Sequence, residues 1–397
     1  MYSLLNGVKV LDLTTIVLGP YGTKIIADFG AEITKIEPLG GDQFRSVRPG
    51  KSEDLGAGFI NLNNNKKSLS IDLTTDAGKT IIAKLVEQSD VVVHNMRPKS
   101  AAKFNLTFEK LKALKKDIIF CYAPGFGQEG RYGDNPAYDD IIQAASGLAY
   151  LNANAQGEPR FLPTIIGDKV GGLHLALSIL AALFHKSTTG EGSCLEIPMF
   201  ESIVSFMMIE QLAGKSFIPP LGEMGYARLQ SPNRRPFKTK DGYISILPYS
   251  TRHWTKFLKE IGRDDIAETP WVRDPVSRSQ RIDELYQVLS KECLKRTTAE
   301  WFDILDRLDV PHANVNRPDA LLSDPHLKDV SFFREYDHPT DGKMRLARTP
   351  FTVAGATETP DAPAPHIGQN SREVLQSIGY DISEIEKLEA DNVITQY

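Results

Sequence analysis

The chain has 397 residues, which is too long for one ordinary core and predicts two or three domains. Hydrophobic residues make up 41% and charged residues 24% of it, which excludes disorder and low complexity for the bulk of the chain. The formal net charge of -5 is small and gives no argument for a nucleic-acid partner.

The first 125 residues alternate between strand and helix patterns. The apolar runs predict strands at 8–14, 32–37, 68–73, 91–94 and 118–123, separated by helices at 20–29, 77–88 and 108–115. Such alternation is typical of a parallel sheet covered by helices on both faces. We therefore expect an α/β fold with a Rossmann-like, parallel-sheet large domain.

The remainder of the chain predicts a second, smaller α+β domain. Residues 138–206 have a helical pattern, with the strongest helix at 169–186 and one strand at 193–197. A linker rich in Gly, Pro, Ser and Asn follows at 216–236, then an isolated strand at 242–247 and an amphipathic segment at 253–261. We expect the large domain at 1–215, the small domain at 225–325, and a C-terminal return to the large domain at 330–397.

The cysteines, histidines and apolar stretches indicate which metal sites, disulfides and membrane segments to expect. Cys121, Cys194 and Cys293 lie far apart without a CxxC pair, which disfavours a disulfide framework and a thiolate zinc site. The histidines are scattered without ligand spacing, so no metal site is expected. The longest apolar stretch, 173–184, is shorter than the roughly 20 residues of a bilayer span. With no signal peptide apparent, we expect a cytoplasmic protein without a membrane partner.

The first strand–helix–strand unit does not predict a dinucleotide site. Glu37 ends the second strand, where an acid could meet a ribose, but the turn at 16–23 lacks the G-x-G-x-x-G spacing. NAD is therefore not expected.

Asp168 lies just ahead of the strongest predicted helix. One interpretation is an N-cap, because an aspartate there accepts a hydrogen bond from an orphan amide. The other is a nucleophile that the helix dipole holds ionised. Gly171 and Gly172 each cost a helix interior about 1 kcal/mol relative to alanine, so we expect something to approach the backbone closely there.

Two further clusters could bind a ligand. Arg97, Lys99 and Lys103 follow a strand end and could neutralise phosphates, while Met96 and Phe104 could flank a flat or flexible body. The segment 136–140 opens a helix that contains Gln143. A solvated basic helix start and ordinary helix capping are the respective alternatives.

Together these segments resemble the class III CoA-transferases, the family that contains formyl-CoA transferase, carnitine CoA-transferase and the 2-methylacyl-CoA racemases. The order and spacing of the matching segments carry the resemblance over nearly the whole chain. They are Gly7–Thr14, Lys35–Glu37, Asn65–Ser68, Asp90–Asn95, Tyr138–Asp139 with Gln143 and Gly147, Gly167–Asp168 with Gly172, Thr189–Gly192, Asp324–Pro325, Thr349–Phe351 and Ile367–Gly368.

The resemblance implies that Asp168 is the covalent nucleophile, forming a mixed anhydride and then an aspartyl-CoA thioester. It implies coenzyme A and acyl-CoA as substrates, no tightly bound cofactor, small carboxylic acids as the other partners, and an interlocked homodimer. The implied CoA contacts fall on Val17, Leu18, Asp72, Leu73, Asn95, Met96, Arg97, Lys103, Phe104, Tyr138 and Asp139. Some members use an arginine for the CoA phosphates where this chain has Pro38, so Arg97 or Lys103 must contribute more.

The racemase branch uses a histidine in a Gly-His-Asp motif as α-proton base. Here that place is Ala137-Tyr138-Asp139, and tyrosine, with a pKa of about 10, is a poor base at neutral pH. A transferase is therefore favoured over the two alternatives, a racemase and a non-catalytic CoA-binding dimer.

The acceptor acid is less defined. Oxalate-specific members have aromatic side chains where this chain has Val47 and Gly58, and a glycine-rich loop in place of 233–242, so oxalate is disfavoured. A dicarboxylate is expected instead, with Arg45, Arg234 or Arg235 as the partner of its distal carboxylate; a solvated linker is the alternative for the last two.

Overall fold

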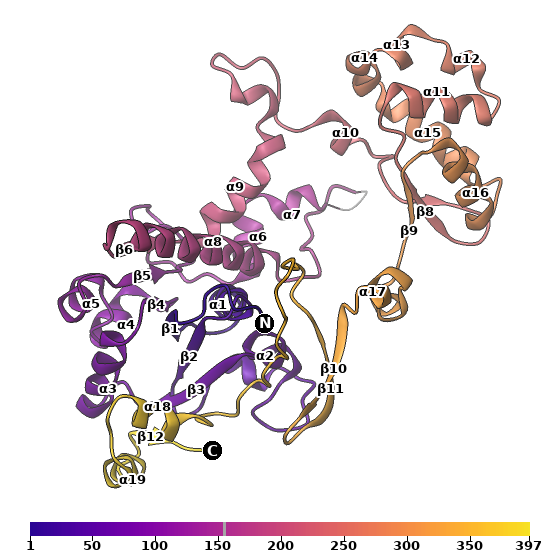
Figure 1. The fold of residues 1–397 in the computed structure, drawn as a ribbon. Coiled ribbons are helices and arrows are strands. Elements are labelled where there is room, and N and C mark those ends of the chain that lie inside the picture. Colours follow the sequence, from indigo (N-terminus) through magenta and orange to yellow (C-terminus); the bar gives the residue numbers. More distant parts are fainter. Residues whose placement is uncertain (154–155) are drawn as a thin grey trace. The chain divides into compact units, whose positions relative to one another are not determined.

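The computed structural model describes residues 1–153 and 156–397 (Figure 1). The chain forms two compact units, a large one of Met1–Phe206 with Ser331–Tyr397 and a small one of Met207–Val330. Each unit is described by itself below.

A seven-stranded sheet forms the centre of the large unit, in the order β12-β3-β2-β1-β4-β5-β6. Its strands are β1 (Lys9–Leu13), β2 (Glu32–Glu37), β3 (Lys66–Ile71), β4 (Val91–His94), β5 (Ile119–Tyr122), β6 (Ser193–Glu196) and β12 (Ile394–Thr395). All neighbours pair in parallel except β12, which runs antiparallel to β3. The predicted α/β class and the mainly parallel sheet are confirmed.

Helices cover both faces of this sheet (Figure 1). The helices of the large unit are α1 (Leu18–Asp28), α2 (Ala57–Asn63), α3 (Asp76–Glu87), α4 (Pro98–Lys103), α5 (Phe108–Leu114), α6 (Asp139–Ala145), α7 (Leu148–Leu151), α8 (Ile166–Thr189), α18 (Ser371–Ser377) and α19 (Ile382–Ala390), with a 3-10 turn η1 at Gln43–Ser46. Helix α9 (Met199–Gln211) crosses the boundary between the two units.

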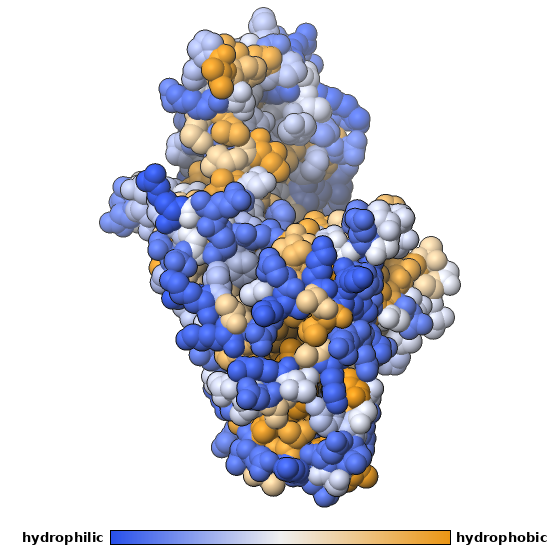
Figure 2. Space-filling model, turned by 90° about the vertical axis from the view of Figure 1, so that its left-hand side faces the viewer, coloured by the Kyte–Doolittle hydropathy of each residue, from blue (hydrophilic) through white to orange (hydrophobic). Residues whose placement is uncertain are grey.

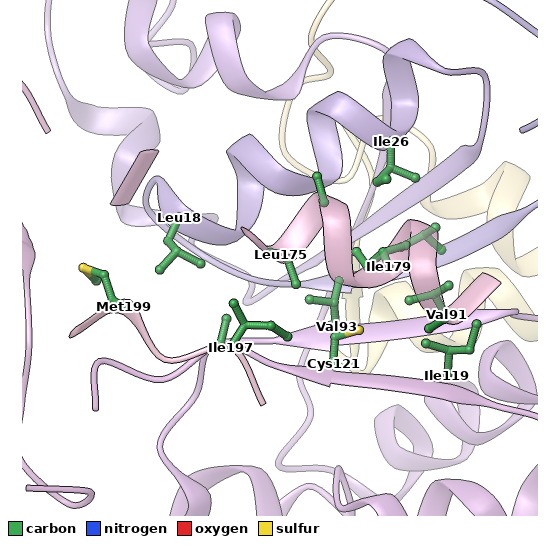
Figure 3. Close-up of a cluster of buried hydrophobic side chains, with 14 of the residues drawn as sticks. Leu18, Ile26, Val91, Val93, Ile119, Cys121, Leu175, Ile179, Ile197 and Met199 are labelled. Carbon is green, nitrogen blue, oxygen red and sulfur yellow. The ribbon is translucent and has the colours of Figure 1, made fainter. Parts of the chain in front are cut away.

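Alternation along each strand separates two cores. Val10 of β1 packs with α1 and α8, whereas its neighbour Leu11 packs on the other face with α3 and α18. Figure 3 shows the first of these cores, where Leu175 lies over Val93 and Cys121. Helices α1 and α8 pack against each other in this core.

The long helix α8 begins three residues earlier than the sequence pattern predicts. By length and composition alone it would pass as a membrane span, a test that core helices of soluble proteins also pass. Half of the most apolar 18-residue stretch of α8 is buried inside this structure.

An antiparallel hairpin, β10 (Phe333–His338) and β11 (Gly342–Ala347), completes the large unit.

The small unit is built on a three-stranded antiparallel sheet, β7-β8-β9, of Phe237–Lys238, Tyr243–Ile246 and His312–Asn314. The strand predicted at 242–247 exists but is not isolated, because the short strands β7 and β9 pair on either side of it. The other elements are η2 (Ala213–Ser216), α10 (Ala227–Gln230), α11 (Thr251–Glu260), α12 (Asp264–Ala267), α13 (Pro270–Arg273), α14 (Pro275–Gln280), α15 (Ile282–Cys293), α16 (Thr298–Leu308), η3 (Pro318–Ser323) and α17 (Pro325–Asp329).

Aromatic side chains fill the core of the small unit. Trp254 and Phe257 of α11 pack with Trp301 of α16 and Leu285 of α15, and all four are almost fully buried. The start of α16 is fixed by a capping box between Thr297 and Glu300.

Candidate active site

A cavity of about 350 Å³ opens at the carboxyl ends of β1, β4 and β5. The strand order reverses between β1 and β4, and open α/β sheets bind ligands outside the strand ends at such a point. Its wall consists of Thr15, Ile16, Leu18, Pro38, Gly41, Asp42, Gln43, Asn95, Arg97, Tyr122, Ala123, Pro124, Gly125, Gly133, Asn135, Pro136, Ala137, Tyr138, Asp168 and Met199.

Buried charges hold the loop that follows β1. The Lys35 ammonium donates to the Thr14 carbonyl (2.8 Å) and to the Asp42 carboxylate (2.9 Å). Asp42 in turn accepts from the backbone N–H of Ile16, whose φ of 71° is unusual for a β-branched residue. These hydrogen bonds hold the backbone of Ile16 in its strained conformation and so keep the cavity wall in place.

Asn95 joins the ends of β4 and β1. Its side-chain oxygen accepts from the N–H of Thr15 and its amide donates to the Thr15 carbonyl, both at 3.0 Å. Both polar ends of Asn95 are therefore engaged with the protein, and its contribution to the cavity is to fix the loop.

Asp168 does not cap its own helix. It is the third residue of α8, whose N-cap position is Ile165, and its Oδ1 accepts from the backbone N–H of Leu18 (3.1 Å) at the start of α1. The N-cap interpretation is therefore wrong, because the orphan amide that this carboxylate satisfies belongs to a different helix. Oδ2 makes no hydrogen bond among the described residues, so this oxygen is available at the cavity wall.

The glycines at the start of α8 make room for α1. A Cβ atom on Gly171 would lie 2.6 Å from the Leu18 side chain, and one on Gly172 would lie 2.7 Å from the Leu18 carbonyl oxygen. The expected close approach to the backbone is confirmed, and what approaches is helix α1. The same contact places the Leu18 N–H against Asp168.

Asp139 caps the start of α8. Its Oδ1 accepts from the N–H groups of Gly167 (2.6 Å) and Asp168 (3.1 Å), and its Oδ2 accepts from the Gln143 amide (2.6 Å). Asp139 is buried and is not part of the cavity wall, so it supports Asp168 from behind.

The surroundings of Asp168 favour its protonated form. Burial, followed by the neighbouring Asp139 charge, raises the pKa of Asp168 to about 7, against the opposing effect of the Leu18 N–H. The expectation that the helix start alone keeps this carboxylate ionised is therefore wrong. The side chain is 8% exposed and a second carboxylate lies beside it, and together these outweigh the helix dipole.

The structure brings together part of the predicted CoA-binding set. Leu18, Asn95, Arg97 and Tyr138 line the cavity with Asp168, whereas Val17, Asp72, Leu73, Met96, Lys103, Phe104 and Asp139 do not. Val17 is buried at the N-cap of α1. Lys99 is paired with Asp134 at 3.3 Å, which leaves Arg97 as the cation that faces the cavity.

Arg45 is engaged elsewhere. Its guanidinium pairs with both carboxylate oxygens of Glu37 (2.6 and 2.7 Å) and lies 3.7 Å from the centre of the Phe59 ring. This buried bidentate pair argues against the prediction that Arg45 receives a substrate carboxylate. It also removes Glu37 from any contact with a ribose.

Arg234 and Arg235 belong to the small unit and are exposed. They line a cavity of about 250 Å³ together with Arg228.

Several wall residues were missed from the sequence. Tyr122 ends β5 and could have been found from the rule that ligands lie beyond strand ends. Asp42, Gln43 and Met199 carry no signal of this kind, since they reach the cavity only through tertiary folding. No histidine is among the wall residues of this cavity, and residues 1–153 and 156–397 contain no cluster of metal-ligating side chains.

Comparisons with known proteins show which family the chain belongs to. The profile of CoA-transferase family III matches residues 5–371. The chain is 30% identical over 402 residues to succinyl-CoA:mesaconate CoA-transferase of Haloarcula marismortui, covering 95% of this chain and 97% of the relative. It is 28% identical over 397 residues to succinyl-CoA:glutarate CoA-transferase of Mus musculus, covering 99% and 91%. The crystal structure of Rv3272 from Mycobacterium tuberculosis matches with a TM-score of 0.79 at 27% identity, over 93% of this chain and 98% of that one.

Proposed function

Since the chain belongs to CoA-transferase family III, we propose that it moves coenzyme A from an acyl-CoA to a free carboxylic acid through a covalent intermediate on Asp168. The observation that carries the proposal is the free Oδ2 of Asp168 at a cavity wall, with Oδ1 fixed by the Leu18 N–H. A carboxylate oriented through one oxygen presents the other to a bound thioester.

The proposed reaction has four steps. Asp168 attacks the thioester carbonyl of the donor, and a mixed anhydride forms as the CoA thiolate leaves. The thiolate then attacks the aspartyl carbonyl, giving an aspartyl-CoA thioester and releasing the donor acid. The acceptor carboxylate attacks that thioester to form a second anhydride and free the thiolate, which finally attacks the acceptor carbonyl and regenerates Asp168. No step consumes a resident cofactor.

The neighbouring groups have separate roles in these steps. The Leu18 N–H, at the positive start of α1, stabilises negative charge on the aspartyl oxygen when the thiolate or the acceptor attacks. Asp139 positions the backbone that carries Asp168. A pKa of about 7 for Asp168 means that both protonation states are populated at neutral pH, and only the anion is the nucleophile.

Coenzyme A itself is expected in the cavity beyond the strand ends. Arg97, which is exposed at the N-cap of α4, is the proposed partner of a phosphate. Tyr138 is 65% exposed and offers an aromatic face beside it. The contacts predicted on Asp72, Leu73, Met96, Lys103 and Phe104 stay predictions.

A dicarboxylate is the proposed acceptor. Relatives are named for mesaconate and glutarate, which are dicarboxylic acids. Arg234 and Arg235 stay the proposed partners of the distal carboxylate, because neither side chain has an acidic partner in the described part of the chain. Replacing Arg235 with alanine should raise the KM for dicarboxylates and leave that for monocarboxylates unchanged; an unchanged KM for every dicarboxylate would remove this residue from the proposal.

A racemase is the second candidate, and the cavity disfavours it. Proton exchange needs a base in the cavity, and no histidine lines it. Asp42, the other carboxylate in the wall, is already held by Lys35 and by two backbone N–H groups.

We further propose a cytoplasmic homodimer, interlocked as in the family that the sequence resembles. Leu173, Leu177 and Phe184 share one face of α8 and are 45%, 63% and 72% exposed. In the small unit Ile218 is 98% and Leu221 75% exposed. On the face drawn in Figure 2, apolar residues gather in patches between polar ones, as on surfaces that a partner covers.

Mass photometry tests the assembly. A particle of twice 44.1 kDa that persists at nanomolar concentration supports interlocked chains, which cannot separate by simple dilution. A monomer at every concentration would contradict it.

The activity is tested with succinyl-CoA as donor and mesaconate, glutarate, oxalate and acetate as acceptors. The proposal expects transfer to the two larger dicarboxylates, with parallel double-reciprocal plots because the donor acid leaves before the acceptor reacts. Exchange of the α-proton of a 2-methylacyl-CoA into deuterated water without transfer would instead favour the racemase. Binding of acyl-CoA without any turnover would favour a non-catalytic dimer.

A further inference from the structure

The small unit contains a cavity of its own, of about 450 Å³. Its wall comes from α10, α11, α14 and the beginning of α15, with the loop that follows β8. Tyr226, Tyr249, Tyr286 and the indole of Trp254 contribute aromatic surface to this wall. An apolar or flat body is the kind of group that such a wall buries well.

The charged side chains that line this cavity are all arginines. It adjoins the 250 Å³ cavity described above, since Arg228, Leu247 and Tyr286 line both. Between them the two cavities are lined by Arg228, Arg234, Arg235 and Arg278, and by no aspartate or glutamate. Such a site attracts an anion.

Arg228 is only partly satisfied by the protein. Its Nε is buried without a hydrogen bond, its guanidinium interacts with the hydroxyl groups of Tyr226 and Tyr286, and no carboxylate pairs with its side chain in the described ranges. A planar guanidinium at a cavity wall that holds no acid is well suited to a carboxylate or phosphate, which accepts two parallel hydrogen bonds.

Arg278 adds a second buried cation; the negative charge of Asp274 acts on it, but the two side chains form no ion pair in the described residues. It is 6% exposed and donates only to neutral oxygens, those of Thr251 (2.9 Å), Val272 (2.6 Å) and Tyr249 (3.4 Å). These bonds shape the wall around Tyr249 and keep a positive charge behind it. A bound anion would offset the cost of burying that charge.

From these observations we infer that the small unit carries a binding site for an organic anion, one with a carboxylate or phosphate head at Arg228 and an apolar or aromatic body against Tyr226, Tyr249 and Tyr286. The inference does not rest on the covalent chemistry of Asp168, which lies in the other unit. It also differs from the proposed dicarboxylate contacts at Arg234 and Arg235, which line the adjoining 250 Å³ cavity and not this one, because the ligand inferred here has a body to bury.

The tryptophans provide a selective readout. The chain has three of them, Trp254, Trp271 and Trp301, and all lie in the small unit. Trp254 lines the cavity, so its emission should change when the cavity fills. The full-length protein is titrated with phenylacetate and with phenyl phosphate, and in parallel with succinate and with uncharged 2-phenylethanol.

We expect saturable changes in emission with phenylacetate or phenyl phosphate, and the tighter of the two identifies the head group. Succinate and 2-phenylethanol should bind at least about tenfold more weakly, since one lacks the body and the other the charge. Arg228→Met should raise the Kd of the preferred ligand at least about tenfold. Arg252→Met, which removes an exposed arginine of α11 that pairs with Asp309 outside the cavity, should leave it unchanged.

Asp168→Ala separates this site from the proposed activity, because it should abolish transfer and leave the Kd for phenylacetate unchanged. If Arg228→Met lowers the melting temperature strongly, Arg228→Lys is used instead, since it keeps the charge and loses the paired donors. The inference fails if neither aromatic anion changes the emission, if 2-phenylethanol binds as tightly as both, or if succinate binds as tightly as phenylacetate.

Discussion

Replacing Gly172 with alanine tests whether the contact between α1 and α8 positions the reactive side chain. In an isolated helix this change would stabilise by about 1 kcal/mol. Here the new Cβ would lie 2.7 Å from the Leu18 carbonyl oxygen and 2.9 Å from the Tyr21 ring, where ordinary contacts begin at 3.4 Å. The oxygen belongs to the backbone of α1, so the two helices must move apart.

Overpacking of this kind costs about 1–3 kcal/mol. Subtracting the gain in helix propensity, we expect Gly172→Ala to lower the free energy of unfolding of the large unit by up to about 2 kcal/mol. The Leu18 N–H, now 3.1 Å from Asp168, would move with its helix, so the rate of transfer should fall as well. Gly171→Ala is the matched control, because its Cβ would meet the end of the flexible Leu18 side chain at 2.6 Å.

Urea unfolding followed by circular dichroism measures both variants. Tryptophan emission serves as an internal reference, because it reports only the small unit and should be unchanged. The reasoning is refuted if Gly172→Ala is more stable than the wild type, or if it costs no more than Gly171→Ala and transfers CoA at the normal rate.

Three further predictions concern charges at the cavity. The rate of covalent adduct formation should rise with pH through about 7 and then level off. Asp139→Asn should move this midpoint to lower pH, because the amide oxygen can keep the hydrogen bonds from the Gly167 and Asp168 N–H groups, although not the one from Gln143, while a neighbouring charge is lost. A midpoint unmoved by Asp139→Asn would contradict this cause. Because the folded-state pKa of Asp168 is raised from 3.8 to about 7, the stability it contributes is complete below pH 3.8 and is lost as the pH rises to about 7. Asp168→Asn should therefore be more stable than the wild type at pH 8, by up to about 4 kcal/mol. Urea titrations should show this difference in stability shrinking toward pH 4. A difference that stays constant with pH would contradict the raised pKa of Asp168. Finally, Arg97→Met should raise the KM for acyl-CoA about three- to tenfold. Lys99→Met is the control and should change the KM little, because it removes a cation already paired with Asp134. Equal effects of the two changes would contradict the proposed contact between Arg97 and a phosphate.

Local patterns predicted the large unit well. Each strand of the parallel sheet is a short apolar run between turn residues. Residues such as Val10 and Leu11 are buried on opposite faces, so the strand is apolar along its length and can be recognised from its own residues. In the small unit the pattern found β8 but missed β7 and β9, which are two and three residues long. Runs that short carry no periodicity.

The sequence singled out Asp168 as a candidate but did not predict the contacts that hold its side chain. Asp168 could be singled out from the sequence because it precedes a long helix and because the surrounding segments resemble a known family. The carboxylate of Asp168 caps α1 by accepting from Leu18, which lies 150 residues away in the sequence. Asp139 caps α8 by accepting from the N–H of Asp168, 29 residues away. Sequence spacing contains no information about such contacts, and the raised pKa follows from them.

Intact-protein mass spectrometry after brief mixing with succinyl-CoA tests the central claim most directly, with the wild type beside Asp168→Ala. The account predicts an adduct of the mass of coenzyme A or of the succinyl group, which maps to the peptide containing Asp168 and is absent from the variant. An adduct that persists in Asp168→Ala, or transfer that proceeds at the wild-type rate without Asp168, would contradict it.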